Sequence, residues 1–256
     1  MLTRAIVRPP SASFANGLTD ADLGAPDLAL ALDQHACYCA ALEQCGLRLN
    51  RLPADEAYPD STFVEDTAIL TPDCAILTRP GAASRAGEVA SIAAALPGFY
   101  ARIRHIAAPG HVDGGDVCEA DGHFFIGISA RTNVAGAQQL AALLANEGFS
   151  AALVDIRRVA GILHLKSGIS YLGERRLVAI DALAGDPALR GYEVVRIARE
   201  ESYAANFLRI NRHVIISAGF PRFAASVKDF GYPVIALDMS EFRKMDGALS
   251  CLSLRF

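Results

Sequence analysis

Cys251 is the residue of this chain best suited by its surroundings to act as a nucleophile. The segment 246–252 reads DGALSCL, so the thiol lies among small residues. The glycine upstream of it lets the backbone approach a ligand closely. A thiolate is a strong nucleophile when a neighbouring base or positive field lowers the thiol pKa below about 8.5. The segment therefore predicts covalent catalysis if the rest of the chain supplies a base.

His164 is the candidate base. It lies in the sequence GILHLKSG at 161–168, a polar residue inside an apolar run that resembles a buried strand. A single histidine in such a run is more often a structural core residue. Histidine nevertheless has an ordinary pKa of about 6.5 and is the best general acid and base near neutral pH. No histidine of the chain shows metal-ligand spacing, so no metal site is expected.

Asp113 and Asp116 flank two glycines in the sequence DGGD. A polar turn between two strands is the simpler interpretation, because aspartate and glycine are typical turn residues. The functional interpretation makes one carboxylate an acid, a base or a group that orients the histidine.

An acidic segment and two arginines suggest the kind of ligand. The segment 60–66, DSTFVED, holds Asp60, Glu65 and Asp66, which either form an exposed acidic loop or line a dry cavity and need a cationic partner. A guanidinium fits such carboxylates best. Arg85 and Arg131 follow expected strands and are either surface residues or a clamp for an α-carboxylate. Together these groups describe a site for an arginine-like amino acid.

The elements that must position these residues repeat along the chain. Short buried strands are expected at 5–9, 74–80, 123–131, 177–181 and 213–222, and helices at 27–45, 84–96, 135–146 and 223–230. A period of roughly 50 residues predicts about five units, with one short copy near 177–212. An open doubly wound sheet is the alternative. A ring of units is favoured because the candidate residues come from different repeats and only a shared centre would gather them.

Composition excludes several classes of function. The chain has 256 residues, 52% of them hydrophobic, and a net charge of −4, so a single globular domain over 1–256 is expected. Its scattered basic residues give no electrostatic footprint for nucleic acid, and no apolar stretch is long enough to span a membrane. The six cysteines show no CxxC pair, which favours a reducing, cytoplasmic location over a disulfide framework.

Five motifs in this order resemble the dimethylarginine dimethylaminohydrolase family over essentially the whole chain. They are FVED at 63–66, DGGD at 113–116, HLKSG at 164–168, ESYAAN at 201–206 and SC at 250–251. The resemblance implies an α/β fold, a five-bladed α/β propeller of pseudo-fivefold ββαβ-type repeats around a central active site. It also implies hydrolysis of dimethylarginine and monomethylarginine to citrulline through a covalent S-alkylthiouronium on the cysteine.

The resemblance further implies a role for each candidate residue. Cys251 would be the nucleophile, His164 the general acid and then base, and Asp113 the carboxylate that orients the histidine. The expected substrate-binding residues are Leu18, Asp60, Glu65, Asp66, Arg85, Arg131, Met245 and Ser250, with Leu18 in the mobile lid loop of the family. No metal, nucleotide or organic cofactor is implied, the partner is a small-molecule methylated arginine, and a homodimer is left open.

Two alternative functions remain at this point. One is an arginine deiminase-like hydrolase, against which Lys166 argues: deiminases carry aspartate two residues after the histidine, and lysine removes that acceptor for the N–H groups of plain arginine. The other is a catalytically silent arginine-binding protein in which Cys251 is a small core residue. Alkylation of the thiol would separate the last possibility from the enzymes.

Overall fold

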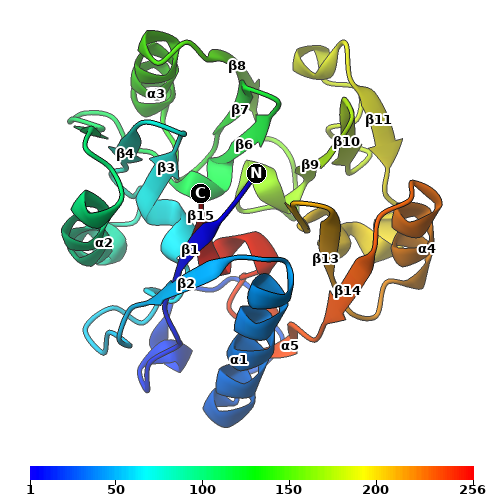
Figure 1. Cartoon of the computed structure of the whole chain (residues 1–256), viewed down its shortest axis with the longest axis horizontal. Helices are drawn as coiled ribbons and strands as arrows, with labels where there is room; N and C mark the ends of the chain where they lie inside the picture. The colour runs from blue at the N-terminus through cyan, green and yellow to red at the C-terminus, as the bar shows by residue number, and fades with distance from the viewer. The chain divides into compact units, whose positions relative to one another are not determined.

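Five three-stranded sheets of the same construction make up the protein (Figure 1). The structure is a computed structural model that describes residues 1–256. In each sheet the middle strand pairs antiparallel with the strand before it in the repeat and parallel with the strand after it. The orders are β15-β1-β2, β3-β4-β5, β6-β7-β8, β9-β10-β11 and β12-β13-β14. The repeat is thus a hairpin, a connection and a parallel strand.

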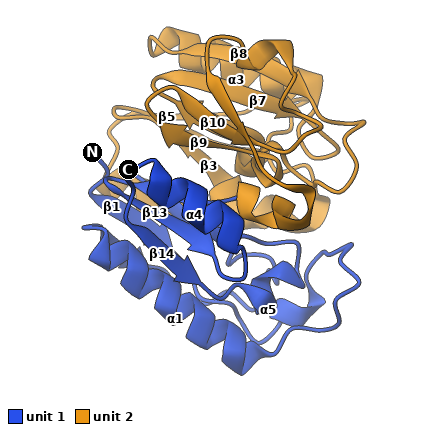
Figure 2. Cartoon of the chain, turned by 90° about the vertical axis from the view of Figure 1, so that its right-hand side faces the viewer, with its two compact units in different colours: residues 1–64, 206–256 blue, residues 65–205 orange.

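The chain divides into two compact units, coloured separately in Figure 2. Unit 1 contains residues 1–64 and 206–256, and unit 2 contains residues 65–205. Unit 1 holds two of the sheets and unit 2 holds three. The expectation of a single domain over 1–256 stays a prediction.

The first sheet of unit 1 joins strands from distant parts of the sequence. Strand β1 (Arg4–Val7) pairs parallel with β2 (Arg48–Arg51) and antiparallel with β15 (Ser253–Arg255). Helix α1 (Leu28–Gln44) connects β1 to β2, close to the predicted helix over 27–45. Its first turn is capped by the Asp27 carboxylate, which accepts a hydrogen bond from Leu30 N at 3.0 Å.

The second sheet of unit 1 contains β12 (Leu208–Ile210), β13 (His213–Ser217) and β14 (Val234–Leu237), with helix α4 (Pro221–Asp229) between the last two. A short helix, α5 (Ser240–Arg243), follows. Phe14, Phe63 and Phe242 pack together in unit 1, with ring centroids 5.6 to 6.3 Å apart. A Cβ at Gly247 would lie 2.3 Å from the Phe63 ring, so only glycine fits there.

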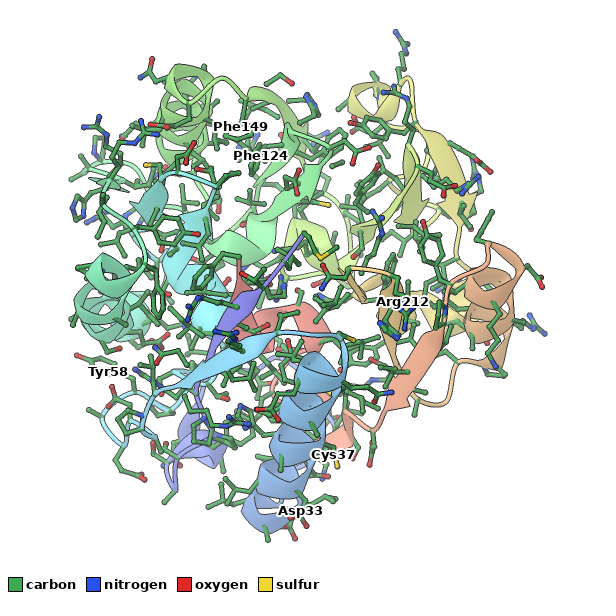
Figure 3. The ribbon with its side chains drawn as sticks, in the orientation of Figure 1. Asp33, Cys37, Tyr58, Phe124, Phe149 and Arg212 are labelled. Carbon is green, nitrogen blue, oxygen red and sulfur yellow. The ribbon has the colours of Figure 1, made fainter.

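The first two sheets of unit 2 follow the repeat closely. Strands β3 (Ala68–Leu70), β4 (Ala75–Leu77) and β5 (Ile103–His105) form one sheet. Strands β6 (Val117–Ala120), β7 (His123–Ile128) and β8 (Ser150–Asp155) form the other, with helix α3 (Val134–Asn146) between β7 and β8. The rings of Phe124 and Phe149 meet edge to face at 5.4 Å in the core beside this helix (Figure 3).

The helix predicted over 84–96 is divided in the structure. A 3₁₀ segment, Ala83–Glu88, precedes helix α2 (Val89–Ala95), and a second 3₁₀ turn, Leu96–Gly98, ends it. The pairing of Arg85 with Glu88 three residues later suits the tighter first segment.

The third sheet of unit 2 is the short copy expected from the sequence. It contains β9 (Ile169–Gly173), β10 (Arg176–Ala179) and β11 (Glu193–Arg196). Its connection holds a single 3₁₀ turn, Pro187–Leu189, instead of an α-helix. The segment 180–192 is short and contains glycines and a proline, which favour turns. None of the helices combines the length and apolar character required to span a bilayer.

Candidate active site

Three buried side chains of unit 2, Asp66, Asp113 and His164, form what we call the acid–base cluster. His164 Nε2 lies 3.1 Å from Asp113 Oδ2, and one polar atom of each of the three residues lies within 4.8 Å of those of the other two. Asp113 precedes the 3₁₀ turn Gly114–Asp116, and His164 precedes the 3₁₀ turn Leu165–Ser167. Two residues far apart in sequence therefore meet as a buried imidazole–carboxylate pair.

The paired glycines of the DGGD motif are required by close packing. A Cβ at Gly114 would lie 2.0 Å from the Glu65 carbonyl oxygen, and a Cβ at Gly115 would lie 2.7 Å from His164 Nδ1. The Gly115 N–H also donates to Asp66 Oδ1 at 2.8 Å. The motif therefore packs directly against the Glu65 backbone and the His164 ring. It does more than form a polar turn between two strands.

Asp116, the second carboxylate of the motif, holds the backbone beside the histidine. It accepts hydrogen bonds from Leu165 N at 2.9 Å and from the Ser129 hydroxyl at 2.6 Å, and burial raises its pKa. The expectation that the run around His164 is a buried strand is wrong. The Leu165 N–H bonds to this side chain instead of to a neighbouring strand, and β9 begins only at Ile169.

The environment of His164 favours its protonated form. Burial alone would lower its pKa, but attraction to Asp66, the hydrogen bond to Asp113 and the nearby Asp116 raise the pKa to about 9. The pKa of Asp113 moves the opposite way: burial would raise it, and the hydrogen bond and positive charge of His164 lower it overall. The imidazole can therefore hold a proton at neutral pH and deliver it to a bound group.

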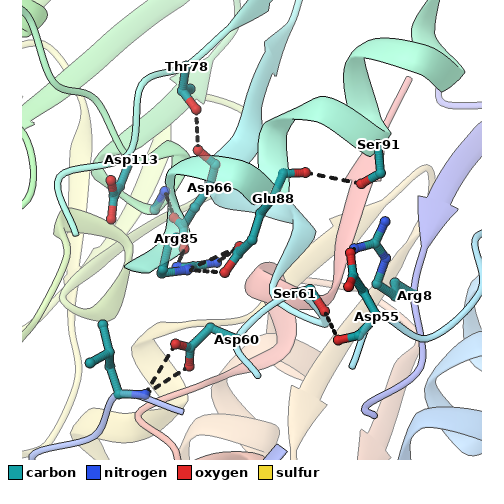
Figure 4. A network of polar contacts seen from close by, with 12 residues as sticks. Arg8, Asp55, Asp60, Ser61, Asp66, Thr78, Arg85, Glu88, Ser91 and Asp113 are labelled. Atoms are coloured by element: carbon teal, nitrogen blue, oxygen red, sulfur yellow. Dashed lines mark hydrogen bonds and ion pairs between the residues drawn. The ribbon is translucent and has the colours of Figure 1, made fainter. Parts of the chain in front are cut away.

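Asp66 is held on its other side by the Arg85 guanidinium (Figure 4). Arg85 Nη1 lies 2.5 Å from Asp66 Oδ2, and Nη2 donates to Glu88 Oε2 at 2.8 Å. Burial would lower the pKa of Arg85, but both carboxylates raise it above its usual value. Binding a substrate carboxylate with Arg85 would require at least one of these contacts to be given up.

Arg131 differs from Arg85 in its environment. It is half-buried, and only its backbone is engaged, because its N–H donates to the Ser129 hydroxyl at 2.9 Å. A Cβ at Gly81 would lie 2.2 Å from the Arg131 carbonyl oxygen, so this glycine lets the two backbone segments approach. The side chain of Arg131 makes no hydrogen bond or ion pair with the protein, in contrast to Arg85.

Glu65 and Lys166 form a second charge pair in unit 2. Lys166 Nζ lies 2.6 Å from Glu65 Oε1, and the carboxylate is almost completely buried. Lys166 lies on the 3₁₀ turn that follows His164. Of the two acidic residues expected to hold a guanidinium, one thus contacts an ammonium and the other a guanidinium of the chain itself.

Metal binding is the competing use of the acid–base cluster, because two aspartates and a histidine can ligate an ion. A metal requires a neutral imidazole, whereas the raised pKa of His164 keeps the ring protonated at neutral pH. Asp66 and Asp113 already face the cations of Arg85 and His164. The arrangement favours proton transfer over metal binding.

Cys251 lies in unit 1, on a segment of residues 246–252 that we call the nucleophile turn. It is half-buried in the 3₁₀ turn Leu249–Leu252. The side chain of Asn206 fixes the preceding residue: its Oδ1 accepts from Ser250 N at 2.9 Å, and its Nδ2 donates to the Ser250 hydroxyl at 3.0 Å. Arg255 adds a bond from Nη1 to the Ser250 carbonyl oxygen at 3.0 Å.

Leu18, Asp60 and Met245, all in unit 1, lie close together. Leu18 N lies 3.1 and 3.2 Å from the two oxygens of the Asp60 carboxylate. A Cβ at Gly17 would lie 2.4 Å from Asp60 Oδ1 and 3.2 Å from Met245 Cε. The three residues expected from the family resemblance to hold the amino end of a ligand are therefore gathered around one glycine.

Similar proteins identify the family. No protein-family model matches the chain. The N(G),N(G)-dimethylarginine dimethylaminohydrolase of Pseudomonas aeruginosa is 45% identical over 257 residues, which cover all of both chains. The structure of a cysteine-to-serine mutant of the P. aeruginosa enzyme, complexed with citrulline, matches all of both chains with 44% identity and a TM-score of 0.97. The chain belongs to the dimethylarginine dimethylaminohydrolase family.

A second structure of the family carries a covalent ligand. A dimethylarginine dimethylaminohydrolase with histidine replaced by glycine, solved as an adduct with S-methyl-L-thiocitrulline, matches with a TM-score of 0.96 and 44% identity over all of both chains. Full-length agreement with these structures confirms the predicted fold class, the five-bladed α/β propeller of the dimethylarginine dimethylaminohydrolase family.

Four of the other five cysteines of this family member are buried thiols with raised pKa values. Burial raises the pKa of Cys39 and Cys45 to about 11 and that of Cys118 to about 12, and burial also raises the pKa of Cys74. Thiols with raised pKa values ionise poorly and are weak nucleophiles. Cys37 is exposed on α1 (Figure 3), so it is the thiol that a labelling experiment must remove.

Sequence reasoning missed two side chains that position candidate residues of this family member. Glu88 holds Arg85, and the spacing of three residues within a helical segment was a usable signal. Asn206 was part of a quoted motif but had no predicted role. It is 44 residues from Ser250, and no local pattern connects positions so far apart.

Proposed function

We propose that this family member hydrolyses Nω,Nω-dimethyl-L-arginine and Nω-monomethyl-L-arginine to L-citrulline and dimethylamine or methylamine. The observation that carries the proposal is the buried His164–Asp113 pair, with Nε2 and Oδ2 3.1 Å apart, in a chain of the dimethylarginine dimethylaminohydrolase family. This pair supplies the proton that the leaving amine needs, since an amine leaves as a neutral molecule far more easily than as an anion.

The first half of the proposed reaction forms a covalent intermediate. The Cys251 thiolate attacks the central carbon of the guanidinium, and a carbon–sulfur bond forms. The carbon–nitrogen bond to dimethylamine then breaks while His164 transfers its proton to the departing nitrogen. An S-alkylthiouronium remains on Cys251, and His164 is left neutral beside Asp113 and Asp66.

The second half releases the product. Neutral His164 removes one proton from water, and the oxygen adds to the same carbon. The carbon–sulfur bond then breaks to give the thiolate, and the second proton of the added water passes to solvent as the citrulline carbonyl forms. Asp113 keeps the imidazole oriented through both proton transfers. The reaction as proposed needs no metal, nucleotide or organic cofactor.

The charges of unit 2 support a cationic ligand. Carboxylates outnumber cations around the acid–base cluster, and an unbalanced buried carboxylate costs several kcal/mol. A substrate guanidinium would reduce that cost. The carboxylates are Glu65, Asp66, Glu88, Asp113 and Asp116, against the cations Arg85, Lys166 and His164.

The other substrate contacts follow the family resemblance. We propose that Asp60, with backbone groups of Leu18 and Met245, holds the α-ammonium, and that Arg131 binds the α-carboxylate. Ser250, the residue before Cys251, would position the nucleophile through its hydrogen bonds to Asn206. Arg85 would join Arg131 at the carboxylate by releasing Glu88, or would hold Asp66 in place as it does in this structure.

Lys166 supports methylated substrates over plain arginine. Its ammonium lies 2.6 Å from Glu65 Oε1, so this oxygen is already satisfied and is less available to the N–H groups of arginine. Methylation removes those donors, so the methylated substrate leaves fewer of them unpaired. Each hydrogen bond to a charged group is worth about 1.5 to 3 kcal/mol, or roughly tenfold or more in discrimination.

Citrulline release from asymmetric dimethylarginine and from arginine, measured side by side for wild type and Cys251→Ser, tests the proposal. Turnover of the methylated substrate that disappears in the variant supports it. Turnover of arginine alone would indicate a deiminase. No turnover of either substrate would favour the arginine-binding alternative.

Thiol labelling provides a second, independent test of Cys251. Iodoacetamide inactivation is measured in a Cys37→Ser background, because Cys37 is the exposed thiol and the other four are buried with raised pKa values. Substrate should slow the inactivation, and the adduct should map to Cys251. A homodimer and a cytoplasmic location stay proposals, which sedimentation of the purified chain and fractionation of cells would check.

A further inference from the structure

The segment 17–27 is an irregular loop of unit 1 that is tied down by carboxylates at both ends. Asp60 accepts from Leu18 N near its start, and Glu241 accepts from Asp27 N at 2.6 Å at its end. Residues 21–26 between these ties contain no helix or strand and are half-buried or exposed, and Leu23 is 51% exposed. Such a segment opens at low free energy because few contacts hold it.

Asp246 provides a third tie, from the nucleophile turn. Its Oδ2 accepts a hydrogen bond from Asp20 N at 2.6 Å and lies 3.1 Å from the Thr19 hydroxyl. That hydroxyl also lies 2.9 Å from the Lys244 carbonyl oxygen, so its proton can serve either acceptor. One carboxylate thus joins the 17–27 loop to the segment that carries Cys251, more than 220 residues away in sequence.

Asp246 has a backbone conformation that costs free energy for a residue other than glycine. Its φ of +54° lies in the left-handed region, which L-residues other than glycine adopt at a cost. Glycine would adopt the same backbone without strain, but it has no carboxylate to offer. The advantage of an aspartate at this position therefore lies in its contacts with Thr19 and Asp20 of the loop.

The turn around Asp246 is well packed. The Asp246 carboxylate therefore stays in place when the 17–27 loop moves. Gly247 N donates to the Phe242 carbonyl oxygen at 2.9 Å, and the Phe63 ring packs against Gly247. Cys251 N donates to the Ala248 carbonyl oxygen at 3.2 Å. The Asp246 carboxylate thus connects the weakly held 17–27 loop to the well-packed nucleophile turn.

We propose that Asp246 is a positioning residue, a latch that fastens the 17–27 loop to the nucleophile turn and is released when a ligand enters. The proposal rests on the proposed function for its kinetic consequence only. Release breaks the bonds to Thr19 and Asp20, and reclosure over a bound substrate forms them again. Loss of the latch should therefore weaken substrate retention more than it slows the chemical steps.

Hydrogen exchange tests the latch without any assay of activity. In Asp246→Gly the backbone keeps its conformation and loses only the acceptor, so the amide of Asp20, which donates to the carboxylate, should exchange about tenfold faster than in wild type. Asp246→Asn keeps a neutral acceptor and should lie between the two. Thr19→Ala should give a smaller increase. Amides of β13 report global stability and should not change.

Glu174→Gly is the matched control. Glu174 also has a positive φ, +51°, on a non-glycine residue; it lies in unit 2, and its carboxylate accepts a hydrogen bond from Arg176. This substitution relieves the same kind of backbone strain and should leave exchange of the 17–27 loop unchanged. Faster loop exchange in the control would overturn the assignment to Asp246.

Steady-state kinetics with dimethylarginine separate a latch from a structural role. In Asp246→Gly, KM should rise about tenfold while kcat stays within about threefold of wild type. Unchanged loop exchange, or a fall in kcat with KM unchanged, would overturn the proposal. If wild type fails to turn over methylarginines, the proposed function fails, whereas the exchange experiment still decides whether Asp246 fastens the loop.

Discussion

The acid–base cluster of unit 2 and the nucleophile turn of unit 1 are held in place by different kinds of contact. Side-chain charges fix the cluster: His164 bonds to Asp113, and Arg85 bonds to Asp66. In the nucleophile turn the contacts are to backbone atoms: Asn206 accepts from Ser250 N, Arg255 donates to the Ser250 carbonyl oxygen, and Gly247 packs against the Phe63 ring.

The two kinds of contact match the different chemical roles proposed for the two regions. A proton donor needs a tuned charge environment, which buried ions provide at the cost of desolvation. A nucleophile carried on a turn needs a fixed backbone, which hydrogen bonds to the backbone N–H and carbonyl groups provide. Changes of charge should therefore affect the cluster most, and changes of shape should affect the turn most.

The largest expected effect comes from removing His164, the proposed proton donor. His164→Gly should lower kcat about 10²- to 10⁴-fold, because the proposed mechanism assigns protonation of the leaving amine to His164, while dimethylarginine still binds. Citrulline formation and equilibrium binding of the substrate are measured on the same preparation. Turnover within a few fold of wild type would remove His164 from the mechanism.

The two arginines should respond in opposite ways. Arg85→Met leaves Asp66 and Glu88 buried without their cation and should lower the free energy of unfolding by about 3 to 5 kcal/mol. Arg131→Met removes no such pair and should change stability by less than about 0.5 kcal/mol while raising KM. Urea denaturation and kinetics on both variants test this. Equal loss of stability would show that Arg131 also carries a structural ion pair.

The raised pKa of His164 predicts a pH dependence of stability. Because the folded-state pKa of about 9 exceeds the unfolded value of 6.5, this stabilisation is complete below pH 6.5 and is lost as pH rises through 9. The shift corresponds to at most about 3 kcal/mol. Denaturation from pH 6 to 9.5 should show the decline in wild type, and His164→Gln should flatten it. A parallel decline in the variant would assign the effect to other groups.

Asn206→Ala should have a smaller effect on stability and activity, and it acts on the nucleophile turn. It removes both bonds to Ser250 and should lower the free energy of unfolding by about 1 to 3 kcal/mol, with a matching loss of kcat. The pH dependence assigned to His164 should remain as in wild type. A shifted pH profile in Asn206→Ala would show that the two regions are not independent.

Local patterns made much of the fold predictable. The helix over 27–45 and the shortened fourth repeat could be read from apolar periodicity, glycine and proline. The run around His164 could not, because Leu165 bonds to the Asp116 side chain and local pattern does not show such a partner. A buried strand and a buried loop have the same apolar composition.

The candidate site was predictable in its residue types and less so in its contacts. Asp66, Asp113 and His164 lie together as chemistry alone suggested. The guanidinium of Arg85, expected at a substrate carboxylate, is engaged by Asp66 and Glu88, because a buried cation takes the nearest carboxylates. Sequence lists the charges, and only the fold decides which of them neutralise one another.

The pairing of β1 with β15 has a consequence for how the protein folds. Ala5 pairs with Arg255, so this pairing closes a loop of chain that contains all of unit 2, and such long-range contacts form slowly. The nucleophile turn lies immediately before β15 and gains its anchor in the same event. The segment that carries Cys251 is therefore anchored only when this long-range pairing forms, so its order depends on completion of the first sheet.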